Sequence, residues 1–314
     1  MSVRRVLAID GGGIKGVFPV AFLASFEETV NRPIGQFFDL IVGTSTGGII
    51  ALGLGLGFSA TELLSFYEDM GSKVFPGRRL LRLARWLGFP KYSPGPLREA
   101  LRAQFQERRL GESQTRLVIP SLNLETGKIH VYKTAHHERF QKDFKERVVD
   151  IALATAAAPS YFPTFWSSTG LPLIDGGLWA NNPVGPAVVE AIGVLGWRPG
   201  DLRVLSLGCT TAPVDIGIGR RMGMGSLYWG MKIQELFMAG QSWNSLGTAT
   251  LLTGSSNVER ISPIVAAGRF SLDNPREIRS LRGLGFAEAR EALPRLKSTF
   301  FSEPAEAFVP FHTL

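Results

Sequence analysis

Two glycine-rich turns near the N-terminus constrain the fold of this 314-residue chain more than any other feature. The first turn, residues 10–16 (DGGGIKG), follows the apolar run 6–9 (VLAI). The second turn, residues 43–47 (GTSTG), follows the apolar run 40–42 (LIV), and a helical pattern comes after each turn. Repeated strand–turn–helix units are typical of a parallel sheet covered by helices. The N-terminal part of the chain is therefore predicted to be α/β.

The rest of the pattern extends this architecture. We expect strands at about 4–9, 39–43, 117–119, 128–134, 171–174 and 202–207, and helices at about 16–30, 46–54, 60–72, 147–158 and 183–195. After about residue 225 the chain is expected to be mainly helical. The elements predict a three-layer α/β/α sandwich with a mostly parallel sheet and a helical C-terminal elaboration. No linker, charge block or internal repeat divides the sequence, so residues 1–314 are expected to form one domain.

The second turn places Ser45 at the centre of a G-x-S-x-G pattern. A glycine two residues to either side allows a sharp bend between strand and helix, which exposes the serine hydroxyl at the helix N-terminus. The helix dipole there favours the alkoxide or oxyanion that forms during nucleophilic attack. A plain strand-to-helix turn also fits these five residues, so the pattern by itself leaves both interpretations open.

The first turn supplies three consecutive glycines, Gly11, Gly12 and Gly13. Their amides can point into one concavity, which binds either a phosphate or an oxyanion. The common phosphate motifs are incomplete: Lys15 precedes Gly16, so the G-K-[ST] end of a P-loop is missing, and a dinucleotide fingerprint with its partner acid is not completed. The two turns together therefore indicate acyl transfer, with an oxyanion held beside the serine.

A serine nucleophile needs a base, and the four histidines are poor candidates. His130 alternates with apolar residues and is expected on the surface of a strand. His136 and His137 lie in a polar stretch that is expected to be a solvated loop, and His312 is at the tail. None is predicted to act as a base or as a metal ligand.

Asp175 is the stronger candidate for the base, because it ends the apolar run 171–174 and is followed by two glycines. The ends of parallel strands gather at one edge of a sheet, and a carboxylate desolvated there is basic enough to take the Ser45 proton. A role for Asp175 in a turn or helix cap stays open. Asp10 has a similar position, but it fits better as a residue that anchors its turn.

These motifs together resemble those of the patatin-like phospholipases. D-G-G-G-x-x-G is met at residues 10–16, G-x-S-x-G at 43–47 and D-G-G at 175–177, in the family's order and spacing. The match spans roughly residues 4–210. Two further blocks, ATAAAPSYFP at 154–163 and DGGLWANNP at 175–183, also look like the family.

The resemblance implies a serine acyl hydrolase that cleaves fatty acyl esters of membrane glycerophospholipids. Ser45 would be the nucleophile and Asp175 the base of a Ser–Asp dyad. Gly11, Gly12 and Gly13 would form the oxyanion hole. The mechanism requires no metal and no organic cofactor.

Composition adds expectations about the compartment. The single cysteine, Cys209, excludes an intramolecular disulfide framework, is expected as a buried thiol at a strand end, and fits a reducing cytoplasm. The N-terminus runs straight into the first strand and leaves no room for a signal peptide. Residues 40–58 carry no charge but are rich in glycine, so a strand, a turn and a core helix are expected there rather than a membrane span.

Positive charge is concentrated in residues 73–109, which contain ten Lys or Arg against two Glu, a net +8 that exceeds the +7 of the whole chain. Within this segment Arg78, Arg82 and Arg85 share one helical face, beside Arg79, and leucines lie largely on another. The pattern suits an interfacial helix on anionic lipid, and a lid or surface helix fits it equally well. Apart from this positive charge, little in the sequence supports nucleic-acid binding. The enzyme is therefore expected in the cytoplasm, peripheral to the inner face of the membrane when active.

The sequence also permits a role in binding nucleotides. Residues 272–285 (LDNPREIRSLRGLG) resemble a C-terminal segment of the bacterial patatin-like effectors that cyclic oligonucleotides switch on in antiphage defence. A helix capped by Asp273 or Asn274, with Pro275 at its first position, also explains the segment. Two interpretations stay open: a hydrolase with a cyclic nucleotide activator, and a binding protein that holds nucleotide phosphates in its glycine-rich loops without lipase activity.

Overall fold

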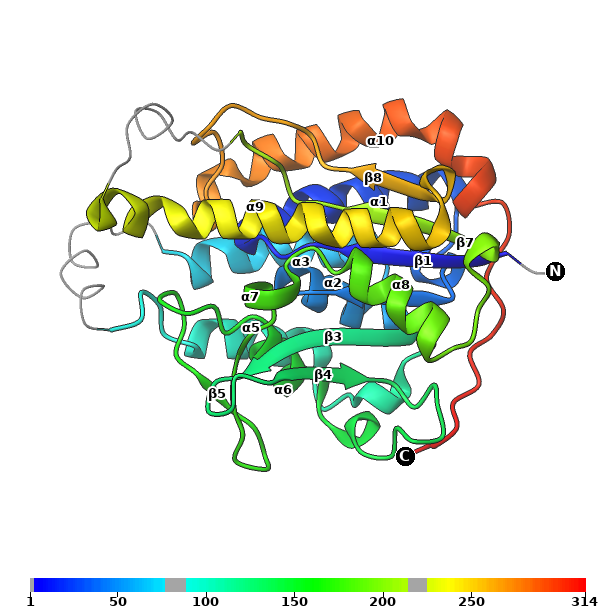
Figure 1. Ribbon diagram of the computed structural model, residues 1–314, viewed down its shortest axis with the longest axis horizontal. Coiled ribbons are helices and arrows are strands. Elements are labelled where there is room, and N and C mark those ends of the chain that lie inside the picture. The colour runs from blue at the N-terminus through cyan, green and yellow to red at the C-terminus, as the bar shows by residue number, and fades with distance from the viewer. Residues whose placement is uncertain (1–2, 77–88, 214–224) are drawn as a thin grey trace.

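The structure, a computed structural model, describes residues 3–76, 89–213 and 225–314 (Figure 1). Its centre is an eight-stranded sheet with the path β5-β6-β3-β2-β1-β7-β8 and with β4 paired to β3. The segment β3-β2-β1-β7-β8 is parallel throughout, whereas β4, β5 and β6 join by antiparallel pairing. The strands are β1 (Arg4–Ile9), β2 (Leu40–Gly43), β3 (Arg116–Asn123), β4 (Ile129–Lys133), β5 (Phe165–Trp166), β6 (Pro172–Asp175), β7 (Leu202–Leu207) and β8 (Val258–Ile261).

Helices cover both faces of this sheet. Figure 1 shows α8 and α9 on its near face, with α1 and α2 behind it. The described α-helices are α1 (Val17–Val30), α2 (Thr46–Gly55), α3 (Ala60–Val74), α5 (Gly95–Phe105), α6 (Val148–Thr155), α7 (Gly177–Ala180), α8 (Val184–Gly193), α9 (Ser226–Thr253) and α10 (Ile278–Phe300).

The side chains of β1 show why the sheet needs two helical layers. Leu7 and Ile9 pack into the apolar core that contains α1, α2 and α3, whereas Val6 and Ala8 pack against α8 on the opposite face. All four are fully buried. A strand buried on both sides reads as a continuous apolar run, because neither face meets water. The predicted three-layer α/β fold with a mostly parallel sheet is thereby confirmed.

The strand that carries Asp175 does not join the sheet as the sequence suggested. Val118 of β3 pairs with both β2 and β4, and Ser121 of β3 pairs with both β4 and β6. Since β4 takes one side of β3, β2 and β6 must share the other side. β2 is parallel to β3 and β6 is antiparallel, so the C-terminal ends of β2 and β6 point toward each other. The expectation that Asp175 ends a parallel strand is wrong.

The C-terminal part is mainly helical, as expected, with the long helices α9 and α10, and it also adds one strand to the sheet. After α9 the chain forms β8, which pairs in parallel with β7 and extends the sheet. Four residues are too short a run for a clear periodic signal. Before α10, Asn274 caps a short 3-10 helix, η8 (Pro275–Glu277), with its side chain accepting a hydrogen bond from the Arg276 amide, as the sequence indicated. The short helix α5 was not expected from the sequence.

Residues 40–58 form β2, the turn and the buried helix α2, which accounts for their lack of charge. Across residues 3–76, 89–213 and 225–314, no helix has both the length and the apolar character needed to cross a bilayer.

Two glycines let α2 begin directly against the sheet. A Cβ atom on Gly47 would lie 2.2 Å from the carbonyl oxygen of Ile9 and 2.7 Å from that of Asp10. A Cβ atom on Gly43 would lie 2.0 Å from the Gly47 carbonyl oxygen. These obstacles are backbone atoms, which cannot move aside as a flexible side chain can. The G-x-S-x-G spacing is therefore a packing requirement, whatever the serine does.

We expect Gly47→Ala to lower the free energy of unfolding by about 2 kcal/mol or more, because the new methyl group must displace the end of β1. Gly193→Ala in α8 is the matched control, since its Cβ would meet nothing within 4 Å. The control is expected to be neutral or slightly stabilising, as alanine is favoured over glycine in a helix. Thermal and denaturant unfolding of both variants measures the difference, and equal midpoints would contradict the packing argument.

Candidate active site

Ser45 lies at the tip of the turn between β2 and α2 in a strained backbone conformation. Its φ of 55° and ψ of −121° are unusual for a residue with a side chain. Thr155 holds the turn from the side: its Oγ1 accepts a hydrogen bond from the Ser45 amide (3.0 Å) and donates one to the Pro120 carbonyl (2.6 Å). The Ser45 side chain is half-buried. This geometry fixes where the hydroxyl points.

The Ser45 hydroxyl points to Asp175, at the end of β6. Ser45 Oγ donates to Asp175 Oδ2 at 2.6 Å, and the Gly177 amide donates to Oδ1 at 2.7 Å. Asp175 is only 5% exposed, and it makes no ion pair with any described residue. The structure therefore brings together the two residues that the sequence proposed, in a buried contact.

Burial raises the pKa of Asp175 from 3.8 to about 6, while the hydrogen bonds from Ser45 and Gly177 oppose the shift. The dominant cause is desolvation, because no nearby cation compensates the charge of the carboxylate. A carboxylate with this pKa is mostly ionised at neutral pH and is a stronger base than an exposed aspartate. Both properties suit a residue that must take a proton from serine.

The first glycine-rich turn lies beside Ser45. A Cβ atom on Gly11 would be 3.2 Å from Ser45 Cβ, so the two turns are in contact. The Gly11 amide donates to the Asn181 carbonyl at 3.0 Å and is therefore occupied. The amides of Gly12 and Gly13 donate to no residue in the described part of the chain. Gly13 has a φ of 57° and its Cα faces the Leu272 carbonyl, which leaves no space for a side chain.

Asp10 anchors this turn through a partner that the sequence analysis missed. Arg260 of β8 donates from Nη1 to Oδ1 (2.8 Å) and from Nη2 to Oδ2 (2.5 Å), a bidentate ion pair. Arg260 Nη1 also donates to Ser206 Oγ on β7. The pair ties the end of β1 to the edge strand of the sheet. Only the pairing of β8 with β7 brings Arg260 there, and no local motif marks it.

Leu272 is a second contact that the sequence did not reveal. Its carbonyl accepts a hydrogen bond from the Ile14 amide at 2.8 Å and so supports the turn from outside. The next residue, Asp273, accepts from Tyr92 Oη at 2.6 Å and pairs with Lys91. The segment that precedes α10 thus braces the first turn, in addition to starting a helix.

The histidines and Cys209 take no part in this cluster. His136 is buried, where its ring nitrogens bond to Thr134 and Glu190, so its placement in a solvated loop was wrong. The polar residues around His136 suggested exposure to solvent, but Thr134 and Glu190 bond its ring nitrogens and so make its burial possible. Cys209 is a buried thiol under Gly12, as expected, and burial raises its pKa to about 12. In the described ranges, no three His, Cys, Asp or Glu side chains gather as a metal site would require.

The remaining predicted site residues, Arg78, Arg79, Arg82 and Arg85, fall within 77–88, outside the residues that the structure describes. They stay a prediction from the sequence.

We expect Asp175→Asn to slow labelling of Ser45 by a fluorophosphonate about 100-fold or more, because the amide cannot accept the proton. In the unsubstituted protein the labelling rate should fall as pH drops through about 6, where Asp175 becomes protonated. Equal labelling rates in the two proteins would contradict the role of Asp175 as base.

Asp175→Asn, which is expected to slow labelling, should raise the stability of the fold at neutral and higher pH. The folded-state pKa lies above the unfolded value of 3.8, so ionised Asp175 destabilises the fold as pH rises from about 4 to about 6. The cost corresponds to about 3 kcal/mol at most. Asp175→Asn should therefore be more stable than the unsubstituted protein at pH 8 and lose this advantage at pH 4. Denaturant unfolding at both pH values measures it.

Comparison with known proteins identifies the family to which this arrangement belongs. The family described as patatin-like phospholipase matches residues 7–188. A Pseudomonas aeruginosa protein named cGAMP-activated phospholipase is 38% identical, over 76% of this chain and 72% of its own length. Proteins of the same name from Escherichia coli and Vibrio cholerae are 32% and 31% identical, each over 97% of this chain and over 94% and 96% of their own lengths. The chain belongs to the patatin-like phospholipase family.

Proposed function

We propose that this chain hydrolyses fatty acyl esters of membrane glycerophospholipids through Ser45 and Asp175, and that a cyclic dinucleotide activates it. The observation that carries the catalytic part is the 2.6 Å hydrogen bond from Ser45 Oγ to the buried carboxylate of Asp175. Family membership supports the reaction class, and the contact between a serine hydroxyl and a buried carboxylate supports their proposed roles as nucleophile and base.

In the proposed mechanism Ser45 Oγ attacks the ester carbonyl while Asp175 takes its proton. The carbonyl oxygen becomes an oxyanion, which the amides of Gly12 and Gly13 stabilise, and Gly11 shapes the turn with its own amide bound to Asn181. Asp175 then protonates the departing alcohol. Water, deprotonated by Asp175, hydrolyses the acyl-enzyme and restores the serine. The proton of Ser45 thus leaves with the alcohol, and the proton that Asp175 takes from water restores the serine hydroxyl.

A small, largely apolar cavity beside Asp175 supports an acyl group as substrate. It has a volume of about 160 Å³ and is lined by side chains that include Leu153, Phe162 and Trp166. Ala157, another lining residue, accepts the backbone hydrogen bond of Asp175 at 3.0 Å. The cavity is therefore adjacent to the proposed base, where an acyl chain attached to the reacting carbonyl needs an apolar environment.

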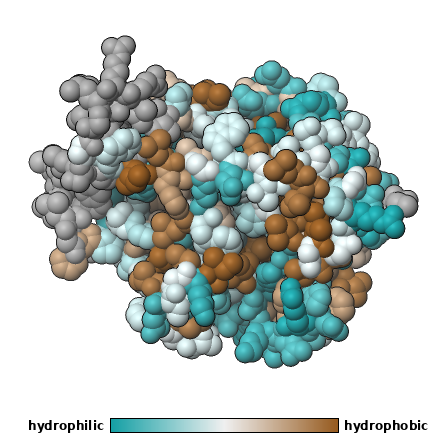
Figure 2. Space-filling view, in the orientation of Figure 1, coloured by the Kyte–Doolittle hydropathy of each residue, from teal (hydrophilic) through white to brown (hydrophobic). Residues whose placement is uncertain are grey.

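Contact with a membrane is supported by the exposed face of α9. Ile233, Phe237 and Trp243 are each more than half exposed. The same helix reaches the site, because Gln241 Oε1 accepts from the Asn181 amide and its Nε2 donates to the Gly177 carbonyl. Figure 2 shows apolar side chains on this face, over α8 and α9. A lipid surface against α9 would thus lie near Ser45.

The activator is proposed from the relatives, whose names describe phospholipases activated by cGAMP. The similarity to two of them extends over 97% of this chain, including the C-terminal segment that braces the first glycine-rich turn. A phosphate cradle in that turn is not favoured, because the Gly11 amide is occupied by Asn181.

We expect Ser45→Ala to release no fatty acid from phospholipid vesicles, whether or not cyclic GMP-AMP is present, since the nucleophile is gone. The fold should be retained because alanine fits wherever serine does. Ser206→Ala, which removes a hydroxyl that contacts Arg260 but neither Ser45 nor Asp175, is a control expected to be far less damaging to activity. Fatty-acid release and circular dichroism provide the measurements, and full activity in Ser45→Ala would refute the assignment.

Replacing Arg78, Arg79, Arg82 and Arg85 together with glutamine tests membrane contact. Each basic residue near an anionic surface contributes up to about 1 kcal/mol, so binding to anionic vesicles should fall about 100-fold or more if all four engage. Hydrolysis of a short soluble ester should be spared, and raised salt should weaken vesicle binding in the same way. Equal losses on vesicles and on the soluble ester would mean that the segment acts on the active site or the fold.

A further inference from the structure

A second pocket lies at the opposite edge of the sheet from Ser45. It has a volume of about 490 Å³, within the usual range for small-molecule sites. Its residues include Asp39 and Arg116, which stand at the starts of β2 and β3, whereas Ser45 follows the end of β2. The C-terminal tail, residues 304–308, forms one wall. The site described above does not use this pocket.

Arg116 is a cation in this pocket with unused hydrogen-bonding capacity. In the described chain its one hydrogen bond runs from Nη1 to the Asp39 carbonyl, at 3.3 Å, and it forms no ion pair. Its guanidinium lies between the rings of Trp197 (5.6 Å) and Phe308 (5.0 Å). An arginine has five N–H donors, so most of them remain available to an anion. Stacked arginines are a common means of binding phosphates.

Two more arginines stand at the same edge, and exposed carboxylates of the tail neutralise them. Arg4 pairs with buried Asp39 (2.9 Å) and with Glu306 (2.7 Å), and Arg5 pairs with Glu303 (3.4 Å). The Glu303 and Glu306 side chains are 78% and 63% exposed, so these pairs contribute little stability. Arg4 and Arg116 both lie over the Trp197 ring, so removing the Glu306 carboxylate leaves two arginines against Asp39 at the pocket, a net charge of +1 that favours an anionic ligand.

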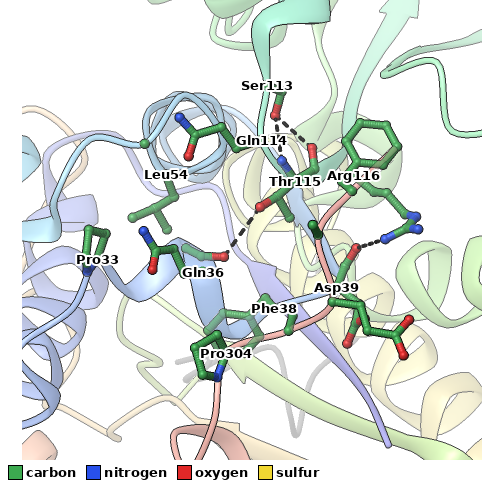
Figure 3. A pocket seen from close by; sticks show the side chains of 16 residues that line it. Pro33, Gln36, Phe38, Asp39, Leu54, Ser113, Gln114, Thr115, Arg116 and Pro304 are labelled. Carbon is green, nitrogen blue, oxygen red and sulfur yellow. Dashed lines mark hydrogen bonds between the residues drawn. The ribbon is translucent and has the colours of Figure 1, made fainter. Parts of the chain in front are cut away.

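The pocket also offers groups suited to nucleobases. The side-chain amides of Gln36 and Gln114 make no hydrogen bond to any described residue. Figure 3 shows both amides beside Leu54, on the side of the pocket away from Arg116 and Asp39. An amide both donates and accepts, as base edges require. The phosphate-binding cations and the base-reading amides are thus separated across the cavity.

Helix α2 connects this pocket with Ser45. Ser45 is the N-cap of α2, and Leu54, in its last turn, lines the pocket. At the other end of α2, the Gly55 carbonyl accepts a hydrogen bond from the backbone amide of Gln114 at 2.7 Å. A helix of ten residues spans about 15 Å. A ligand that contacts the loop around Gln114 therefore touches one end of the helix whose other end carries Ser45.

We infer that this pocket binds a cyclic dinucleotide, whose phosphates take the place of the Glu306 carboxylate on Arg4 and engage Arg116, while residues 304–308 remain as a wall of the pocket. The inference rests on the proposed activation by a cyclic dinucleotide. The forms with and without the Glu306 carboxylate on Arg4 differ in affinity for the ligand, because that carboxylate occupies a phosphate position in one form only. That difference is what allows a ligand to shift the equilibrium.

The test is calorimetric titration of cyclic GMP-AMP into the full chain and into three single variants. Arg116→Gln should weaken binding at least tenfold. Glu306→Gln should strengthen it about two- to tenfold, because a competing carboxylate is lost. Arg290→Gln, on the exposed surface of α10, is the matched control and should bind as the unsubstituted chain does. Loss of folding would weaken binding in every variant, so the opposite signs separate ligand recognition from stability.

Three outcomes would overturn part of this scheme. If cyclic GMP-AMP neither binds to the unsubstituted chain nor raises its fatty-acid release, the proposed activation is wrong and the nucleotide site falls with it. If it binds and activates but Arg116→Gln binds within twofold, activation stands and the pocket is not the site. If inorganic phosphate or phosphatidylglycerol vesicles bind in an Arg116-dependent way and cyclic GMP-AMP does not, the ligand is a phosphate or a lipid headgroup instead.

Discussion

The hydrogen bond between Ser45 and Asp175 depends on two strands that meet end to end on the same side of β3. β2 delivers the serine from one direction, and antiparallel β6 delivers the carboxylate from the other. Close backbone packing makes this meeting possible, since α2 must begin against the end of β1 with no side chain at Gly47. The reactive pair is thus a consequence of sheet topology, and the strained conformation of Ser45 is maintained by the packing around it.

The two buried aspartates Asp10 and Asp175 differ in their partners. Burial raises the pKa of Asp10, but its bidentate ion pair with Arg260 opposes the shift and holds β1 to β8. Asp175 has no such partner among the described residues, and burial raises its pKa to about 6. An arginine beside Asp175 would lower its pKa and weaken it as a base. The fold therefore keeps the buried carboxylate of Asp175 without a cation among the described residues, at a cost in stability.

The two edges of the parallel strands carry different chemistry. At their C-terminal edge lie the serine, the carboxylate and the glycine amides. At their N-terminal edge lie three arginines and the tail that partly neutralises them. Figure 1 shows the tail, in red, running from α10 down one side of the molecule. Helix α2 spans the distance between the edges and so connects the proposed ligand pocket with the proposed nucleophile.

The sequence by itself determined the local features: the strand–turn–helix units around both glycine-rich turns, the place of Ser45 at the N-terminus of α2, the cap at Asn274 and the α/β class. These follow from periodicity and glycine spacing, which act over a few residues. Tertiary structure decided the direction of β6, the place of β8 and Arg260 beside Asp10, the burial of His136 between Thr134 and Glu190, and the occupied amide of Gly11. Each of these depends on contacts between residues far apart in the chain, or on whether a polar group finds a partner once buried, and neither leaves a periodic signal.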